Sequence, residues 1–472
     1  MHTLKVTFVV LEVLLLFNLL IFVHELGHFL AARWRKMKVE RFSIWFGKPV
    51  WKTTVNGVEY CLGWIPAGGY VLLPQMATME ALEGKSETPV EQLPPASPLD
   101  KILVALAGPL FSFLLAFTFA VLVSLVGRPI NEADRTTAIG WVDRSGPAWQ
   151  AGLRPGDRIL EVDGHPVTQF SPSSTDSVTW RIVTSEGTNI PIKYVRDNRE
   201  GMAYPVPYRR PTQWYERKAL RQILISPAHE IVLWDIATNS PAALAGLRRG
   251  DEVLAVNGER AYSVRAIVQA EQSATNASAG PARLAVKRGA QQLEVTLKGE
   301  KPLRPADSLP SFGILSLQVD NRTILTYPHP LAQIRASAGQ IVSTFRTLLS
   351  RKSDVGIQQL GGAVMIVRAY KNLFEAEEGW RLVLWFSVVL NVNLALLNLL
   401  PFPVLDGGHI TLALVECIRR RPVSGKILQY LQTACALALI AFMLFIAFYD
   451  TGDWVRSARS DREEPIVFAP KN

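Results

Sequence analysis

The sequence predicts a multi-pass α-helical membrane protein with four transmembrane helices and a tandem pair of β-rich domains inserted between the second and third helices. The first supporting observation is composition: 49% of the 472 residues are hydrophobic, and the mean hydropathy is +0.15, which is high for a purely soluble protein. The second is a set of long apolar runs, and the third is an internal duplication in the polar stretch between two of these runs.

Three of the apolar runs contain no charged residue and have the length that a hydrocarbon core of about 30 Å requires. They are residues 102–127, 382–405 and 427–449. A fourth run, 6–34, is apolar for most of its length but contains Glu12, His24, Glu25 and His28. We interpret it as a retained helix rather than a signal peptide, because Lys5 alone makes a poor n-region and no small-x-small cleavage site directly follows.

The short loops give the expected orientation, since Lys and Arg in short loops stay on the cytoplasmic side. Basic residues cluster in 33–41, at and after the end of the first run, and in 419–426, between the third and fourth runs. Both loops are therefore expected inside the cell. This assignment places the N-terminus, the insert 128–381 and the C-terminal tail on the extracytoplasmic side.

The insert contains a duplication with an offset of 94 residues, which lays Gly146–Asp157 over Ser240–Asp251. Each copy predicts a short helix ended by glycine, a Gly-Asp turn, and an alternating strand closed by Asp163-Gly164 or Asn257-Gly258. The pattern resembles a tandem pair of PDZ domains of the bacterial protease-associated type. Such domains capture an extended peptide at a sheet edge, or the pair only screens access to the membrane part; the sequence leaves both open.

Charge and cysteine content exclude two other classes of site. The formal net charge is +9, but Lys and Arg are spread along the chain without a basic tract interleaved with aromatics, so no nucleic-acid partner is expected. The three cysteines, Cys61, Cys417 and Cys435, have no C-x-x-C spacing. They predict neither a disulfide framework nor a thiolate metal site.

The first apolar run contains the pattern H-E-L-G-H, with His24, Glu25 and His28. Histidines four residues apart project from one face of a helix and can share a metal. A catalytic zinc takes three protein ligands and a water, and Glu25 is placed to take a proton from that water. Two surface histidines on a soluble helix are the alternative, but ionisable side chains inside a membrane helix are costly and are retained for function.

Asp406 is the predicted third ligand. It follows a stretch at the inner end of the third run that contains Asn393, Asn398, Pro401 and Pro403, and two glycines come after it. Prolines end regular helix, and broken backbone at membrane depth is tolerated where it lines a polar cavity. The loop charges bring Asp406 to the same half of the membrane as the two histidines. The alternative is that Asp406 caps a helix or contacts loop arginines. The five other histidines, His409 among them, lie mostly in the tail or the insert and are not selected.

Together these motifs resemble the site-2 protease family, most closely its bacterial RseP type (regulator of sigma-E protease). The resemblance covers essentially the whole chain and includes segments 39–47 and 65–70. It implies a Zn²⁺-dependent endopeptidase of the bacterial inner membrane that cuts single-span transmembrane substrates, such as anti-sigma factors or remnant signal peptides. The resemblance implies that His24, His28 and Asp406 are the zinc ligands and that Glu25 is the general base. It also implies a set of residues near the substrate, which are Asn393, Asn398, Pro401 and, in a membrane-dipping β-loop, Gly68 and Gly69.

Two departures from the family pattern stand out. Ser112 replaces the usual Asn of Ala-Gly-Pro-x-x-Asn, and Gly361-Gly362-Ala363 replaces a Gly-Pro, which is expected to loosen that segment. Neither is expected to touch the zinc site. A catalytically inactive PDZ membrane scaffold and a metal-ion transporter remain as alternatives, although the inverted repeat typical of transporters is not evident.

The predicted segments are a first transmembrane helix (1–34), a cytoplasmic loop with the β-loop (35–100), a second transmembrane helix (101–127), two PDZ domains (128–225 and 226–305), an extracytoplasmic linker with amphipathic helices (306–380), a third transmembrane segment (381–406), a cytoplasmic loop (407–426), a fourth transmembrane helix (427–449) and an extracytoplasmic tail (450–472).

Overall fold

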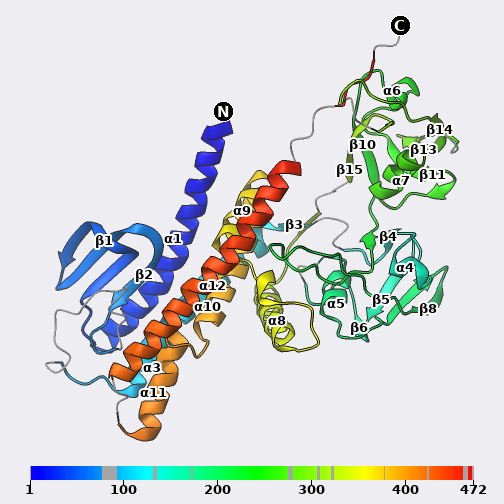
Figure 1. Ribbon diagram of the computed structural model, residues 1–472. Coiled ribbons are helices and arrows are strands. Elements are labelled where there is room, and N and C mark those ends of the chain that lie inside the picture. Colours follow the sequence, from blue (N-terminus) through cyan, green and yellow to red (C-terminus); the bar gives the residue numbers. More distant parts are fainter. Residues whose placement is uncertain are drawn as a thin grey trace. The chain divides into compact units, whose positions relative to one another are not determined.

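The computed structural model describes residues 2–76, 93–130, 135–171, 174–274, 280–305, 309–319, 324–376, 378–421, 425–460 and 466–469. These residues form two compact units (Figure 1). The helical unit comprises Met1–Pro129, Leu325–Val342 and Leu360–Thr451, and the sheet unit comprises Ile130–Ile324, Ser343–Gln359 and Gly452–Asn472.

Within the described residues, four helices are long and apolar enough to cross a membrane, which agrees with the number predicted. They are α1 (His2–Trp34), α3 (Pro98–Val126), α10 (Gly379–Asn398) and α12 (Gly425–Ser460). Helices α1, α3 and α10 share a buried cluster that includes Leu20, Ala116, Ala120 and Val392. Ala116 and Ala120 are fully buried, and such small residues let membrane helices approach closely.

The end of the third span differs from the prediction. Helix α10 stops at Asn398, the stretch 399–405 is not helical, and α11 (Asp406–Arg419) starts directly after it. The loop predicted for 407–426 is therefore mostly helix. Two prolines in 399–405 lack the N–H that helix propagation needs, whereas Asp406 in a first helical turn suits the positive end of the helix dipole. Helix α12 also runs past residue 449, to Ser460.

The first loop folds into a long antiparallel hairpin of β1 (Arg41–Val55) and β2 (Val58–Leu72). Ile44 pairs both with Leu62 and with Gly69, so the two bent strands form a sheet of four segments in the order 51–55, 58–62, 41–44 and 69–72. A shared apolar cluster that includes Ala32 and Phe42 packs the hairpin against α1. Segment 69–72 consequently lies at an edge of this sheet.

Two further helices precede α10. Helix α8 (Pro330–Leu349) lies in the linker 306–380 for which amphipathic helices are predicted, and α9 (Ala363–Glu375) follows it after the short 3₁₀ helix Ile357–Gln359. At Gly361-Gly362-Ala363, where loosening is expected, the structure shows contacts with α12. The backbone N–H groups of Gly362 and Met365 donate to Asp450 of α12, at 3.0 and 3.2 Å, and so anchor the start of α9.

The sheet unit contains two domains of similar build. The first has strands β4 (Ile139–Val142) and β9 (Ile225–Pro227), which pair with each other, and a sheet in the order β6-β5-β7-β8. Its remaining elements are α4 (Pro147–Gln150), β5 (Arg158–Val162), β6 (His165–Pro166), α5 (Val178–Thr184), β7 (Ile192–Arg196) and β8 (Arg199–Ala203). Its core is built from residues such as Ile139, Leu153 and Ile192.

The second domain has the sheet order β14-β13-β11-β10-β15, with β12 paired to β11. Its elements are β10 (Ile231–Ile236), α6 (Pro241–Leu244), β11 (Glu252–Val256), β12 (Glu259–Arg260), α7 (Val264–Ala274), β13 (Ala282–Arg288), β14 (Gln291–Leu297) and β15 (Ile314–Val319). Because β15 pairs with β10, this domain extends to Val319 and not to the predicted 305. A two-stranded sheet of β3 (Arg128–Ile130) and β16 (Ile324–Thr326) completes the strands described. In the tail, Val467 pairs with Arg304.

The duplication is repeated in three dimensions. The turns Asp163-Gly164 and Asn257-Gly258 both have positive φ at their two residues, as tight hairpins require. Each domain also buries an aspartate under an arginine: Asp157 accepts two hydrogen bonds from Arg196, and Asp251 accepts two from Arg288. The sequence repeat therefore corresponds to a structural repeat.

We expect Asp251→Ala to destabilise the second domain by about 1.5–3 kcal/mol, the range for hydrogen bonds to a charged group. Burial raises the pKa of Asp251, but bonds from Arg288 and from the Arg248 N–H outweigh it, so the pKa lies below its usual value. This stabilisation is present above the unfolded pKa of about 3.9 and is lost as the pH falls through the lower folded pKa. Limited proteolysis of the full-length protein across acidic pH measures both effects. The exposed Asp235 on β10 supplies the control, Asp235→Ala, and equal protease resistance of the two variants would contradict the prediction.

Candidate metal centre

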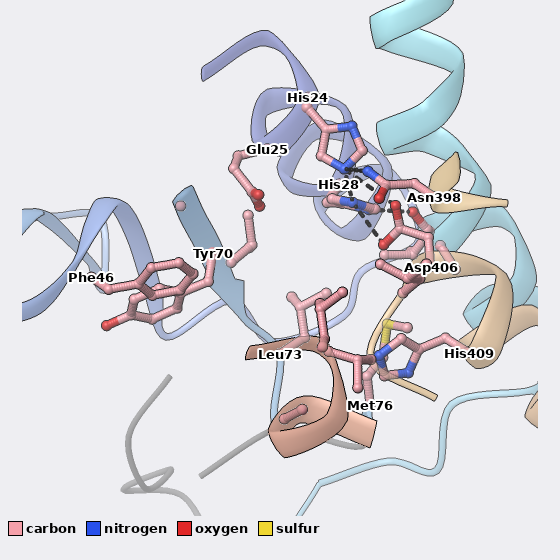
Figure 2. Close-up of a pocket in the computed structure, with 18 of the residues that line it drawn as sticks. His24, Glu25, His28, Phe46, Tyr70, Leu73, Met76, Asn398, Asp406 and His409 are labelled. Carbon is pink, nitrogen blue, oxygen red and sulfur yellow. Dashed lines mark hydrogen bonds and ion pairs between the residues drawn. The ribbon is translucent and has the colours of Figure 1, made fainter. Parts of the chain in front are cut away.

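Three side chains from two distant parts of the chain meet in the helical unit. Helix α1 presents His24 and His28 on one face, and the first turn of α11 presents Asp406. His24 Nε2 lies 3.2 Å from Asp406 Oδ2, His28 Nε2 lies 3.3 Å from Asp406 Oδ1, and the two Nε2 atoms are 3.3 Å apart. Figure 2 shows both imidazoles facing this carboxylate. The structure thus brings together the three predicted ligands, with their ligand atoms within 4.8 Å of one another.

Helix α3 contacts the other edge of both imidazoles, the edge that carries Nδ1. His28 Nδ1 is 2.8 Å from the carbonyl oxygen of Val104, and His24 Nδ1 is 2.9 Å from Ser112 Oγ. A carbonyl only accepts hydrogen bonds, so His28 Nδ1 carries a proton, and in the neutral imidazole the Nε2 atom then presents a lone pair. The prediction that the Ser112 replacement does not touch this site is wrong.

The donor set fits a cation. Asp406 Oδ2 is buried and has no hydrogen-bond partner among the residues that the structure describes, although His24 Nε2 is close to it. A lone pair on His28 Nε2 and a carboxylate oxygen repel each other unless a positive charge lies between them. Two imidazoles and one carboxylate are the ligand types of catalytic zinc sites, which leave a fourth position for water.

Glycines let the helices approach closely enough to build this centre. A Cβ on Gly27, the glycine of H-E-L-G-H, would lie 2.4 Å from the carbonyl oxygen of Ala107, so α1 and α3 touch there. A Cβ on Gly407 would lie 2.2 Å from the Leu399 carbonyl oxygen, and one on Gly408 would lie 2.1 Å from that of Phe402. The two glycines after Asp406 therefore seat the start of α11 on the non-helical stretch before it.

We expect Gly108→Ala to disable the centre. A Cβ at Gly108 would lie 2.2 Å from His28 Nε2 and 2.9 Å from His24 Nε2, so both imidazoles would have to move. A displacement of about 1 Å in a catalytic group costs about 100-fold in activity. Zinc content and peptidase rate of the purified variant measure the effect. Gly339→Ala is the control, since a Cβ at that helical position would meet no described atom within 4 Å apart from its own helix backbone. Normal zinc content and rate in Gly108→Ala would refute the packing argument.

A cavity of about 450 Å³ opens onto the three ligand-type side chains, and Glu25, Asn398 and Gly69 also line it. In Figure 2 the Glu25 side chain lies on the far side of the histidine pair from Asp406. Asn398 Nδ2 is 3.3 Å from His24 Nε2. Pro401 and Gly68 are not among the lining residues, nor is Asn393, whose side-chain oxygen is buried without a partner in the described part of the chain.

Sequence reasoning did not select several of the lining residues, among them His409, Phe46 and Tyr70. His409 lies three residues after Asp406 on α11, and Phe46 and Tyr70 stack in parallel with ring centres 6.0 Å apart. Side chains three apart on a helix share a face, so the spacing of Asp406 and His409 was a usable signal once α11 was recognised as a helix. The Phe46–Tyr70 stack depends on pairing within the hairpin and left no comparable trace in the sequence.

Ligand-type side chains gathered among helices of membrane length fit a membrane-embedded metallopeptidase. The chain belongs to peptidase family M50, whose model matches residues 12–442. It is similar to a candidate zinc metalloprotease of Vibrio cholerae, with 30% identity over 92% of this chain and 96% of the relative. It is 29% identical to the "Regulator of sigma E protease" of Haemophilus influenzae, over 91% of this chain and 96% of the relative. It is also 28% identical to "Protease RseP" of Yersinia pestis, over 92% of this chain and 96% of that relative.

These comparisons, with the four membrane-length helices, make the protein a zinc-dependent metalloendopeptidase of the membrane. They also confirm the resemblance to the site-2 protease family on which the sequence-based expectations depended.

Proposed function

We propose that the protein cleaves single-span transmembrane substrates within the lipid, with His24, His28 and Asp406 as its zinc ligands. The observation that carries the proposal is the convergence of these three side chains among membrane-length helices. Charged and polar groups in such helices are costly unless they serve a function. A relative named for regulating sigma E suggests anti-sigma factors as substrates, and remnant signal peptides are a second class.

Bound zinc would supply Lewis acidity, polarising the scissile carbonyl and making water more acidic. Glu25 takes the proton from the attacking water and then delivers a proton to the leaving amine. Its position in the cavity, outside the three-ligand cluster, supports this role. Asn398, whose amide nitrogen lies beside His24, is proposed to donate a hydrogen bond to the substrate carbonyl as negative charge develops on it.

The hairpin provides a place for an unwound substrate. A transmembrane helix hides its amides in its own hydrogen bonds, so it must become extended before hydrolysis. Segment 69–72 is an edge of the hairpin sheet, and an extended peptide can add to such an edge. Gly69 lines the cavity, and a Cβ there would lie 3.1 Å from Glu25 Cγ. The substrate strand is therefore proposed to run along this edge, past the general base.

The two sheet domains are proposed to be a tandem PDZ pair on the extracytoplasmic side of the bacterial inner membrane. Their matching turns and buried aspartate–arginine pairs support a duplication of one domain type. The basic loops after α1 and after α11 support the orientation. The pair either captures a substrate end or screens substrates by size. Asn393 and Pro401 are retained as proposed substrate-side positions on the family resemblance.

Purified protein in proteoliposomes tests the proposal with reporter proteins that contain one transmembrane segment. We expect cleavage inside the apolar segment, located by mass spectrometry of the fragments, with loss of cleavage after chelation and recovery on adding zinc. An inactive scaffold predicts reporter binding without fragments, and a transporter predicts zinc flux without fragments. Either of those results would refute the proposed activity.

A further inference from the structure

Ser112 is a buried hydroxyl that the proposed mechanism does not use. It lies in the middle of α3, has no exposed surface, and its Oγ is 2.9 Å from His24 Nδ1. Other hydroxyls in the helices of this protein donate to the carbonyl one turn earlier, as Thr118 does to Leu114 and Ser387 does to Val383. That local bond is the usual choice for Ser and Thr in helices. The contact of Ser112 with another helix therefore needs a reason.

The two imidazoles have matching supports on α3. The Val104 carbonyl oxygen holds His28 by its Nδ1, and Ser112 holds His24 in the same way. In a neutral imidazole the carbonyl fixes one tautomer, with the proton on Nδ1 and a lone pair on Nε2. A hydroxyl oxygen that accepts the Nδ1–H of His24 selects the same tautomer for the second imidazole. Both Nε2 atoms then present lone pairs toward Asp406.

The geometry points to Ser112 as a positioning residue that fixes the tautomer and the ring orientation of His24 for metal binding. This inference rests on the proposed zinc site. Metal-bound histidines commonly donate their second ring N–H to an oxygen, and loss of that partner costs about 10- to 100-fold in metal affinity. The serine that replaces the usual asparagine of the second span thus supplies an acceptor oxygen to the site.

The test compares Ser112→Ala with Thr118→Val, which removes a hydroxyl from the same helix at an exposed position away from the cavity. We expect Ser112→Ala to release zinc at a chelator concentration about 10- to 100-fold lower than the unaltered protein, and Thr118→Val to behave like the unaltered protein. The absorption bands of the cobalt-substituted protein should change only in Ser112→Ala. Ser112→Thr, which keeps the oxygen, should restore both zinc retention and the cobalt bands.

Zinc retention in Ser112→Ala equal to that of the unaltered protein would overturn the inference. So would a folded Ser112→Thr that is as impaired as Ser112→Ala, because packing rather than the hydrogen bond would then explain the loss. Asp406→Asn distinguishes a failure of the positioning role of Ser112 from a failure of the proposed ligand set. If Asp406→Asn loses zinc while Ser112→Ala keeps it, only the positioning role fails; if Asp406→Asn keeps zinc, the proposed ligand set itself fails.

Discussion

Glu25→Gln is expected to lower the rate of substrate cleavage by about 10² to 10⁴-fold, the contribution typical of a positioned general base. Glutamine has nearly the same shape as glutamate but cannot accept the proton of the attacking water. Zinc content should be unchanged, because Glu25 lines the cavity without belonging to the three-ligand cluster. Rate measurements on a single-span reporter and metal analysis of the same preparation check both parts.

Glu12→Gln provides the matched control, since it makes the same chemical change on α1 outside the residues that line the cavity. It should retain both zinc and activity. Cleavage by Glu25→Gln at the rate of this control would rule out Glu25 as the base, and loss of zinc from Glu25→Gln would instead make it a ligand.

Asp406→Asn is expected to remove zinc and, with it, nearly all activity. The amide keeps the size of the carboxylate but carries no charge, so the cluster is left with two imidazoles as strong ligands. Metal analysis after purification, with a thermal-unfolding measurement to confirm folding, tests this expectation. The variant also bears on the alternative that Asp406 only caps α11, because a capping role predicts lower stability with normal zinc content.

Glu416→Gln is the control on the same helix, since Glu416 pairs with Lys101 at 2.8 Å and does not line the cavity. Its zinc content should match that of the unaltered protein. If both variants lost zinc equally, disruption of α11 rather than removal of a ligand would be the explanation.

Much of the helical unit could be predicted because its signals are local. A membrane helix satisfies its own backbone groups, so an apolar run of sufficient length is enough to place it. The signals for the β-rich repeats were also local. The pairs Asp163-Gly164 and Asn257-Gly258 predict turns with positive φ, and all four residues have positive φ. The segment after Asn398 was harder to predict, because its prolines indicate that a helix ends but do not indicate that a new helix starts at Asp406.

The sequence by itself selected the residues that are proposed to carry the chemistry. The spacing of His24 and His28 places both imidazoles on one face of a helix, and the setting of Asp406 beside broken backbone made it a candidate ligand. Only the tertiary structure decided that Ser112 and the Val104 carbonyl oxygen support the two histidines, that Gly108 leaves room for them, and that His409 lines the same cavity. These contacts join residues far apart in the chain, and close packing between helices fixes them where no local pattern can.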